Sequence, residues 1–485
     1  MTPARRRWCC AGMCTAALLV TGCAQFGGGA AAPEPMPTLP TLSLDADDRF
    51  SGAAGAPLPT AADLRWWWRF DDAALASWVE RALADNPGIA VADAQVAQAR
   101  ALLQSARARR GVQFGAQADA TLRLQRDAGQ RLLQPGAAFT LDVDADLWGG
   151  LRQAEASAAA GLLRSQDLVQ AARLATAALA ARAYLEWRVA LSDARLLADV
   201  SGLRRDVLRV VTIRVDAGLA PVLDRDRATA ELAATEAEQA AAAVRVRQAL
   251  GALQVLAGER PRPPPLDDVM APDSDEAAGR NDIAALQGVQ PVARPLDLLR
   301  QRPDLRAAEQ ALVGAAADVG VARAALLPRL RLPGRLVFGA VTGGSVLELA
   351  AATLAAALDV TLFDGGAGRA DVDAARARAR AAAQVYRQTL LQALQQVESA
   401  LVAQQGAALR VAARQRASAA ADAAQAQARA LYRAGLVGSL ELIDAQRTAL
   451  ANRRALLQAR ADVSAATVLA FEAMGLIDAP QASGS

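Results

Sequence analysis

Residues 139–147 read Phe-Thr-Leu-Asp-Val-Asp-Ala-Asp-Leu. Apolar and polar side chains alternate without a break along this stretch. Because successive side chains of a β-strand point to opposite faces, the pattern predicts a strand with one apolar and one acidic face. A tilted strand of about 9–11 residues is long enough to cross a bilayer. We therefore expect a membrane strand in which Asp142, Asp144 and Asp146 face a water-filled lumen.

Three further segments alternate in the same way, the last two less strictly. We expect strands over about 112–126, 138–148, 329–340 and 354–363, with a turn at 127–137. Four strands cannot close a barrel, and open strand edges cannot lie in lipid. Three chains with four strands each would form a barrel of about twelve strands. The alternative is an amphipathic sheet on a soluble core, but no spare element is evident to cover its apolar face.

Long helices are predicted for most of the remaining chain. Hydrophobic residues make up 53% of the sequence and aromatic residues only 4%, so that alanine, a strong helix former, and leucine dominate. Two proline-free stretches, at about 151–215 and 369–434, would each form a rod of roughly 100 Å. Their apolar residues recur at alternating spacings of four and three, which is typical of a coiled coil. An ordinary bundle core gives the same stripe, but such long helices are unusual in one.

The chain contains two copies of one unit, because four landmarks recur at an offset of about 216 residues. Each copy consists of a helix, a patch of alternation, a very long helix, a Gly-Leu turn and a closing helix. The first helices are expected at 72–110 and 303–327, and the closing helices at 222–257 and 440–474. We expect the copies to cover 65–257 and 296–476, with a linker at 258–295 and a tail at 477–485.

The N-terminus has the pattern of a bacterial lipoprotein signal. Three arginines precede a short apolar run, and Leu19-Val20-Thr21-Gly22-Cys23 follows. We expect a signal peptide at 1–22, lipid on Cys23 and an extended tether over 23–64, because small residues before a cysteine mark the cleavage site. Ala24 after the cysteine indicates sorting to the outer membrane. The alternative is a plain secretory signal with an incidental cysteine.

The composition excludes most catalytic chemistry. The sequence has no histidine and no lysine, and its four cysteines all lie within the first 23 residues. Serine-histidine triads, Schiff bases, and zinc sites built on thiolates or histidines are therefore excluded from the body of the chain. The net charge of +3 gives no indication of a nucleic-acid surface. We predict a protein that is not an enzyme and has neither cofactor nor metal site.

The chain resembles the outer-membrane efflux duct family of the TolC and OprM type, in its NodT-like lipoprotein branch. The most specific stretch is residues 295–309, which is similar to the family's LP..LL.RRPDI..AE run. The resemblance implies a mainly α fold, in which a long coiled-coil helical barrel is joined to a twelve-stranded trimeric membrane β-barrel. It implies a passive homotrimeric duct, lipid-anchored in the outer membrane, that extends through the periplasm to an adaptor protein and an inner-membrane pump.

Functional residues follow from the same resemblance. Tyr432 resembles the tyrosine of the periplasmic gate, and Asp224 resembles its hydrogen-bond acceptor. Glu441 and Asp444 resemble the acidic positions that ring the constriction; for Asp444 the alternative is a solvated helix charge. The tip turns resemble adaptor-docking grooves, with Gly218, Leu219, Gly435 and Leu436 at their centres.

One departure concerns the gate. The family's gate arginine is replaced by Val437 or Gly438, and its threonine partner by Leu223. One gate link is therefore absent.

Two other classes of function remain open. A lipid-anchored periplasmic coiled-coil scaffold would share the long helices, but it has no use for the acidic strand at 139–147. A carboxylate-only enzyme such as a glycosidase needs two paired acids in a concave site, and no such pair is evident.

Overall fold

The computed structural model describes residues 49–50, 53, 56–125, 130–265, 290–340 and 347–478. The chain divides into two compact units. One contains residues 102–160 and 312–383, and the other contains residues 40–101, 161–311 and 384–485.

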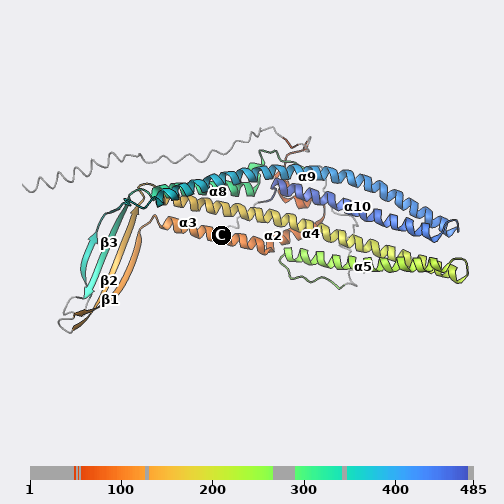
Figure 1. Ribbon diagram of the computed structural model, residues 1–485, viewed down its shortest axis with the longest axis horizontal. Helices are drawn as coiled ribbons and strands as arrows, with labels where there is room; N and C mark the ends of the chain where they lie inside the picture. The colour runs from red at the N-terminus through yellow and green to blue at the C-terminus, as the bar shows by residue number, and fades with distance from the viewer. Residues whose placement is uncertain are drawn as a thin grey trace, which may run out of the picture. The chain divides into compact units, whose positions relative to one another are not determined.

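The first unit carries an antiparallel sheet of five strands (Figure 1). Its strand order is β1-β2-β3-β4, and β5 pairs with β3 beyond β4. The strands are β1 Gln113–Gln125, β2 Gln130–Ala145, β3 Arg329–Ala340, β4 Leu347–Leu354 and β5 Ala357–Asp359. Because β2 and β3 each have neighbours on both sides, only β1 and the β4–β5 side are sheet edges in the described part of the chain.

Two strand predictions need correction. The predicted turn at 127–137 is too long, because residues 130–137 already pair with β1. Pro135 lies opposite Ala120 in that ladder. An antiparallel ladder can contain a proline where the N–H is not needed. The fourth strand, expected at 354–363, is found as two strands with earlier bounds, β4 Leu347–Leu354 and β5 Ala357–Asp359. Pairing ends at Asp359, because its partner Arg329 is the first residue of β3.

The helices agree with the predicted lengths within a few residues, with one exception. The expected first helix at 72–110 is broken at Asn86, which is extended and precedes Pro87. Proline disfavours the α conformation in the residue before it. The helices are η1 Ala61–Phe70, α2 Ala73–Asp85, α3 Pro87–Ala108, α4 Gly150–Asp216, α5 Val222–Leu256, α7 Leu298–Gln301, α8 Pro303–Ala324, α9 Ala367–Arg433 and α10 Ser439–Met474.

The main apolar core of the second unit joins the start of the chain to its last helix. Trp66 of η1 is fully buried and stacks on Phe471 of α10, with ring centroids 5.5 Å apart. Tyr184 of α4 donates a hydrogen bond of 2.8 Å to Asp72, which also caps α2. These contacts hold the first helices against the middle of α4 and the end of α10.

None of the helices in the described ranges combines the length and the apolar character needed to cross a membrane.

Candidate functional site

The polar face of the sheet is built from charged residues on β2 and β3. Asp144 lies directly opposite Arg331, and Thr140 opposite Arg335. Arg331 forms a forked ion pair with Asp142, in which its Nε lies 3.4 Å from Oδ1 and its second nitrogen contacts Oδ2. The side chains of Asp142 and Arg331 remain 34% and 48% exposed. Water can therefore reach this ion pair.

The opposite face of the same strands is aromatic. The ring of Phe139 lies 6.2 Å from that of Phe114 on β1 and 6.0 Å from that of Phe338 on β3. Phe114 is 72% exposed in the single chain. A sheet with one exposed aromatic face and one charged face fits a membrane wall with lipid on one side and water on the other.

Asp146, expected on the acidic face of the strand, lies outside it. This residue follows the end of β2, and its carboxylate accepts hydrogen bonds from the backbone N–H groups of Leu151 (3.0 Å) and Arg152 (2.9 Å). Asp146 therefore caps the N-terminus of α4, where carboxylates are favourable. The alternating pattern continues past the strand, so periodicity alone could not show where the strand ends.

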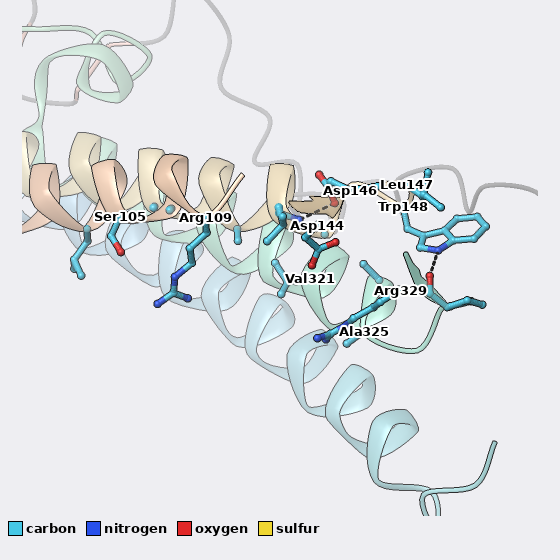
Figure 2. Close-up of a pocket in the computed structure, with 18 residues that line it drawn as sticks. Ser105, Arg109, Asp144, Asp146, Leu147, Trp148, Val321, Ala325 and Arg329 are labelled. Atoms are coloured by element: carbon cyan, nitrogen blue, oxygen red, sulfur yellow. Dashed lines mark hydrogen bonds between the residues drawn. The ribbon is translucent and has the colours of Figure 1, made fainter. Parts of the chain in front are cut away.

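A cavity of about 440 Å³ lies at the junction between the strands and the helices of the first unit (Figure 2). Asp144 and Arg329 line it from the strands, and Arg109 lines it from the end of α3. Trp148 at its rim donates a hydrogen bond of 2.7 Å from Nε1 to the carbonyl oxygen of Pro328. This bond ties the end of the first strand pair to the start of the second.

The second unit contains both Gly-Leu turns, and Figure 1 shows α4 turning back into α5 and α9 into α10. Leu219 N–H bonds to Arg214 O at 2.7 Å, and Leu436 N–H bonds to Leu431 O at 2.9 Å. Both turns are Schellman motifs, in which the glycine, Gly218 or Gly435, has a positive φ. Leu219 and Leu436 are 78% and 72% exposed, so each turn presents an apolar tip.

Tyr432 is buried at the end of α9. Its ring lies in an apolar cluster with Val211 of α4, Ala228 of α5 and Leu442 of α10. The guanidinium carbon of Arg214 lies 4.8 Å from the ring centroid, and its Nη2 donates to Tyr432 O at 3.4 Å. Among the contacts of the described residues, Tyr432 is held by this cluster and by Arg214, and its bond to Asp224 stays a prediction.

The predicted acidic positions lie at the beginning of the helices that follow the turns. Asp224 is half-buried in the first turn of α5. Glu441 and Asp444 are exposed and three residues apart on one face of α10, whereas Leu442 and Ile443 are buried. Carboxylates three residues apart are neighbours on a helix surface.

A partly buried ionic network connects the two helical hairpins; Glu231, Asp193 and Arg204 are its buried members. Arg447 of α10 forms an ion pair with Glu231 of α5, and one heptad further along Arg454 pairs with Glu238 at 2.8 Å. Arg454 also binds Asp193 of α4 at 2.7 Å. Burial lowers the pKa of Arg204, which contacts Glu231 at 3.2 Å in the same network. The network holds α10 in register with α4 and α5.

Two residues of these sites cannot be recognised from the sequence pattern. Arg331 lies in the strand expected at 329–340, but its partner Asp142 is 189 residues away, so the pairing depends on strand register. Arg214 lies in the last turn of α4, where a basic residue reads as an ordinary helix-end charge.

Cys23, the predicted lipidation site, lies outside the described residues. Across the described ranges, no group of three or more acidic, histidine or cysteine side chains could hold a metal ion.

Comparison with known proteins gives consistent matches along almost the whole chain. The sequence pattern of the family described as outer membrane efflux protein matches residues 78–259 and 295–475. The outer membrane protein OprJ of Pseudomonas aeruginosa is 30% identical over 456 residues, which cover 90% of this chain and 92% of OprJ. Nodulation protein T of Rhizobium leguminosarum bv. trifolii is 28% identical, covering 91% and 92%. The solved outer-membrane channel OprN superposes with a TM-score of 0.79 at 29% identity, covering 92% and 99%.

Proposed function

This chain belongs to the outer membrane efflux protein family. From that premise we propose which of its residues line the lumen, which close the periplasmic gate and which bind the adaptor protein. It is the outer-membrane channel of a tripartite efflux system. It forms a trimer, works with a periplasmic adaptor and an inner-membrane pump, and extends from the outer membrane into the periplasm. Its fold joins a helical barrel to a membrane β-barrel.

The gate that we propose lies at the two Gly-Leu turns. Tyr432 and Arg214 hold the α9–α10 hairpin against α4, and Asp224 lies close to the neighbouring turn in sequence. Glu441 and Asp444 are assigned to the constriction, because both are exposed on one face of α10. Three copies around a trimer axis would make two acidic rings. Such rings attract cations and disfavour anions.

We assign the docking of the adaptor to the apolar tips. Gly218 and Gly435 have open space around them, and Leu219 and Leu436 are among the most exposed large apolar residues described.

Asp142 and Asp144 are assigned to the lumen of the β-barrel, because the opposite face of their strand is aromatic. Cys23 is assigned to lipid attachment from its signal sequence alone. The channel acts without catalysis in this proposal.

The observation that carries the gate assignment is the exposed acidic pair on α10. The test is block of the reconstituted trimer by trivalent cations in planar bilayers. Asp444→Ala should weaken block from the periplasmic side about tenfold or more, because it removes one carboxylate ring. Asp462→Ala, a carboxylate further along α10, is the matched control and should leave block unchanged. Equal block in both variants would return Asp444 to a solvated helix charge.

Docking is tested by crosslinking in cells. A photoreactive residue at Leu219 or Leu436 should capture a periplasmic adaptor, whereas the same residue at Leu409, exposed on α9 away from the turns, should not. Capture at Leu409 alone would contradict the docking assignment.

A further inference from the structure

The polar face of the sheet carries arginines as well as aspartates, and they alternate across the strands. Arg331 on β3 forms an ion pair with Asp142 and lies opposite Asp144, both on β2. Arg329, two residues earlier on β3, lies opposite Asp359 of β5. We call Asp142, Asp144, Arg329, Arg331 and Asp359 the charge ladder.

Four of the five ladder residues lie on strands that are paired on both sides within one chain. Asp142 and Asp144 are on β2, and Arg329 and Arg331 are on β3, so trimer contacts at the sheet edges do not supply these four side chains. Asp359 lies on the edge strand β5, where Arg329 of the same chain is its partner. Neighbouring chains therefore repeat the ladder around the barrel rather than alter it. The sequence alone predicts an acidic lumen from β2. The register of the strands places Arg329 and Arg331 beside these aspartates, so that their positive charges offset most of the negative charge.

The ladder can also bind solutes. A guanidinium has five N–H donors in a fixed fork, and the ion pair with Asp142 uses two of them. The Arg331 side chain is 48% exposed, so water and solutes can reach the guanidinium. Arginine stays charged at all relevant pH values and binds carboxylates and phosphates in a bidentate manner. The neighbouring carboxylates can bind a cationic group of the same solute.

Two residues of the charge ladder also line a cavity that is large enough for a small solute. Asp144 and Arg329 line the cavity of about 440 Å³ at the strand–helix junction, together with Arg109 (Figure 2). This volume is within the range of small-molecule sites. Charges of both signs thus continue from the barrel wall into the cavity.

We propose that the charge ladder makes the barrel lumen a charge-balanced surface that takes anionic and zwitterionic solutes, so that any preference for cations arises at the acidic tip and not in the barrel. The proposal rests on the lumen assignment of Asp142 and Asp144 made above.

The test uses the chain's lack of cysteines beyond residue 23. A single cysteine at Thr140, on the ladder face opposite Arg335, is exposed to anionic and cationic methanethiosulfonates added from the extracellular side at low salt. The two reagents should react at rates within about threefold of each other, because Arg331 and Arg335 balance Asp142 and Asp144 around this position. Adding Arg331→Gln should lower the anionic-to-cationic rate ratio by about threefold or more. Arg331→Lys should restore it, and Arg378→Gln on α9 should leave it unchanged.

Two outcomes would overturn the proposal by different routes. A strong preference for the cationic reagent in the Thr140→Cys chain, unaffected by Arg331→Gln, means that the ladder does not set the local potential. Reaction at Leu141→Cys but not at Thr140→Cys, with trimers intact on gels, means that the two faces are reversed. In that case the lumen assignment itself fails.

Discussion

Arg302 donates a hydrogen bond of 2.6 Å to the carbonyl oxygen of Ala473, in the last turn of α10. The same guanidinium binds Asp304 at 2.6 Å and Gln396 of α9 at 2.8 Å, although the residue is only 7% exposed. A Cβ on Gly475 would lie 2.9 Å from Arg302 Cα, so the residue that ends α10 packs directly on Arg302. The most family-specific stretch of the sequence, at 295–309, thus contains a structural clamp on the last helix.

Arg302→Gln should destabilise the trimer. The substitution leaves the carbonyl of Ala473 and the amide of Gln396 without their charged donor, at a cost of about 2–4 kcal/mol in the free energy of unfolding. Thermal unfolding followed by circular dichroism should show a lower Tm. Arg300→Gln, an exposed arginine in the same stretch, is the control and should change Tm little. Equal Tm values for Arg302→Gln and Arg300→Gln would show that the contacts of Arg302 do not contribute to stability.

Asp63 should make stability depend on acidity. Burial alone would raise the pKa of this carboxyl, but hydrogen bonds from Thr60 N–H (2.7 Å), from the Thr60 hydroxyl (2.8 Å) and from Arg69 lower it. A carboxyl whose pKa is lower in the folded state stabilises the fold above its unfolded value of about 3.9, and this stabilisation is lost as pH falls through the folded pKa.

The corresponding variant is Asp63→Asn. It should lower Tm at neutral pH and make Tm less sensitive to acidification below about pH 4. Asp71→Asn is the control in the same region. An unchanged pH profile for Asp63→Asn would contradict the assignment.

Local sequence patterns predict most element lengths, because the helix and strand periodicities depend only on residues that are close together in the sequence. The strand expected at 112–126 is Gln113–Gln125, and the long helix expected at 369–434 is Ala367–Arg433. Strand ends were less predictable, since they depend on which residues remain for pairing. Asp146 continues the alternating pattern but caps a helix instead.

The site residues that depend on distant contacts could not be predicted. The ion pair between Asp142 and Arg331 follows from the register between β2 and β3, which no local pattern encodes. The contact between Arg214 and Tyr432 joins the ends of two helices from different repeats. Exposed acids such as Asp444 could be proposed only from the resemblance to a family.

Leu141→Arg should prevent assembly, whereas Asp144→Asn should not. Leu141 lies between Phe139 and Val143 on the face with the aromatic contacts, which we expect to face lipid. An arginine on the lipid side of a barrel costs about 2–4 kcal/mol near the bilayer midplane. Heat-resistant trimers on gels from outer membranes measure the outcome. Comparable loss of trimers in both variants would mean that the faces are misassigned.

Cys23→Ser should abolish lipid attachment. The Leu19–Cys23 pattern predicts cleavage before the cysteine and acylation of its side chain. Labelled palmitate should be incorporated by the parent chain and by the Cys14→Ser control, and not by Cys23→Ser. Incorporation into Cys23→Ser would leave the plain secretory signal as the correct interpretation.

The tip should stay closed through the ring of Tyr432 rather than through its hydroxyl group. Arg214 contacts the ring face, an interaction of about 0.5–2 kcal/mol, and the apolar cluster buries the ring between the two hairpins. Tyr432→Phe keeps both contacts and should leave single-channel conductance low. Arg214→Gln removes the contact with the ring face, and Tyr432→Ala removes both that contact and the packing in the cluster. Both variants should raise single-channel conductance. Arg209→Gln, an exposed arginine on the same helix, is the control. If Tyr432→Phe opens the channel as much as Arg214→Gln does, the hydroxyl holds the tip. Asp224 would then be the expected partner of that hydroxyl.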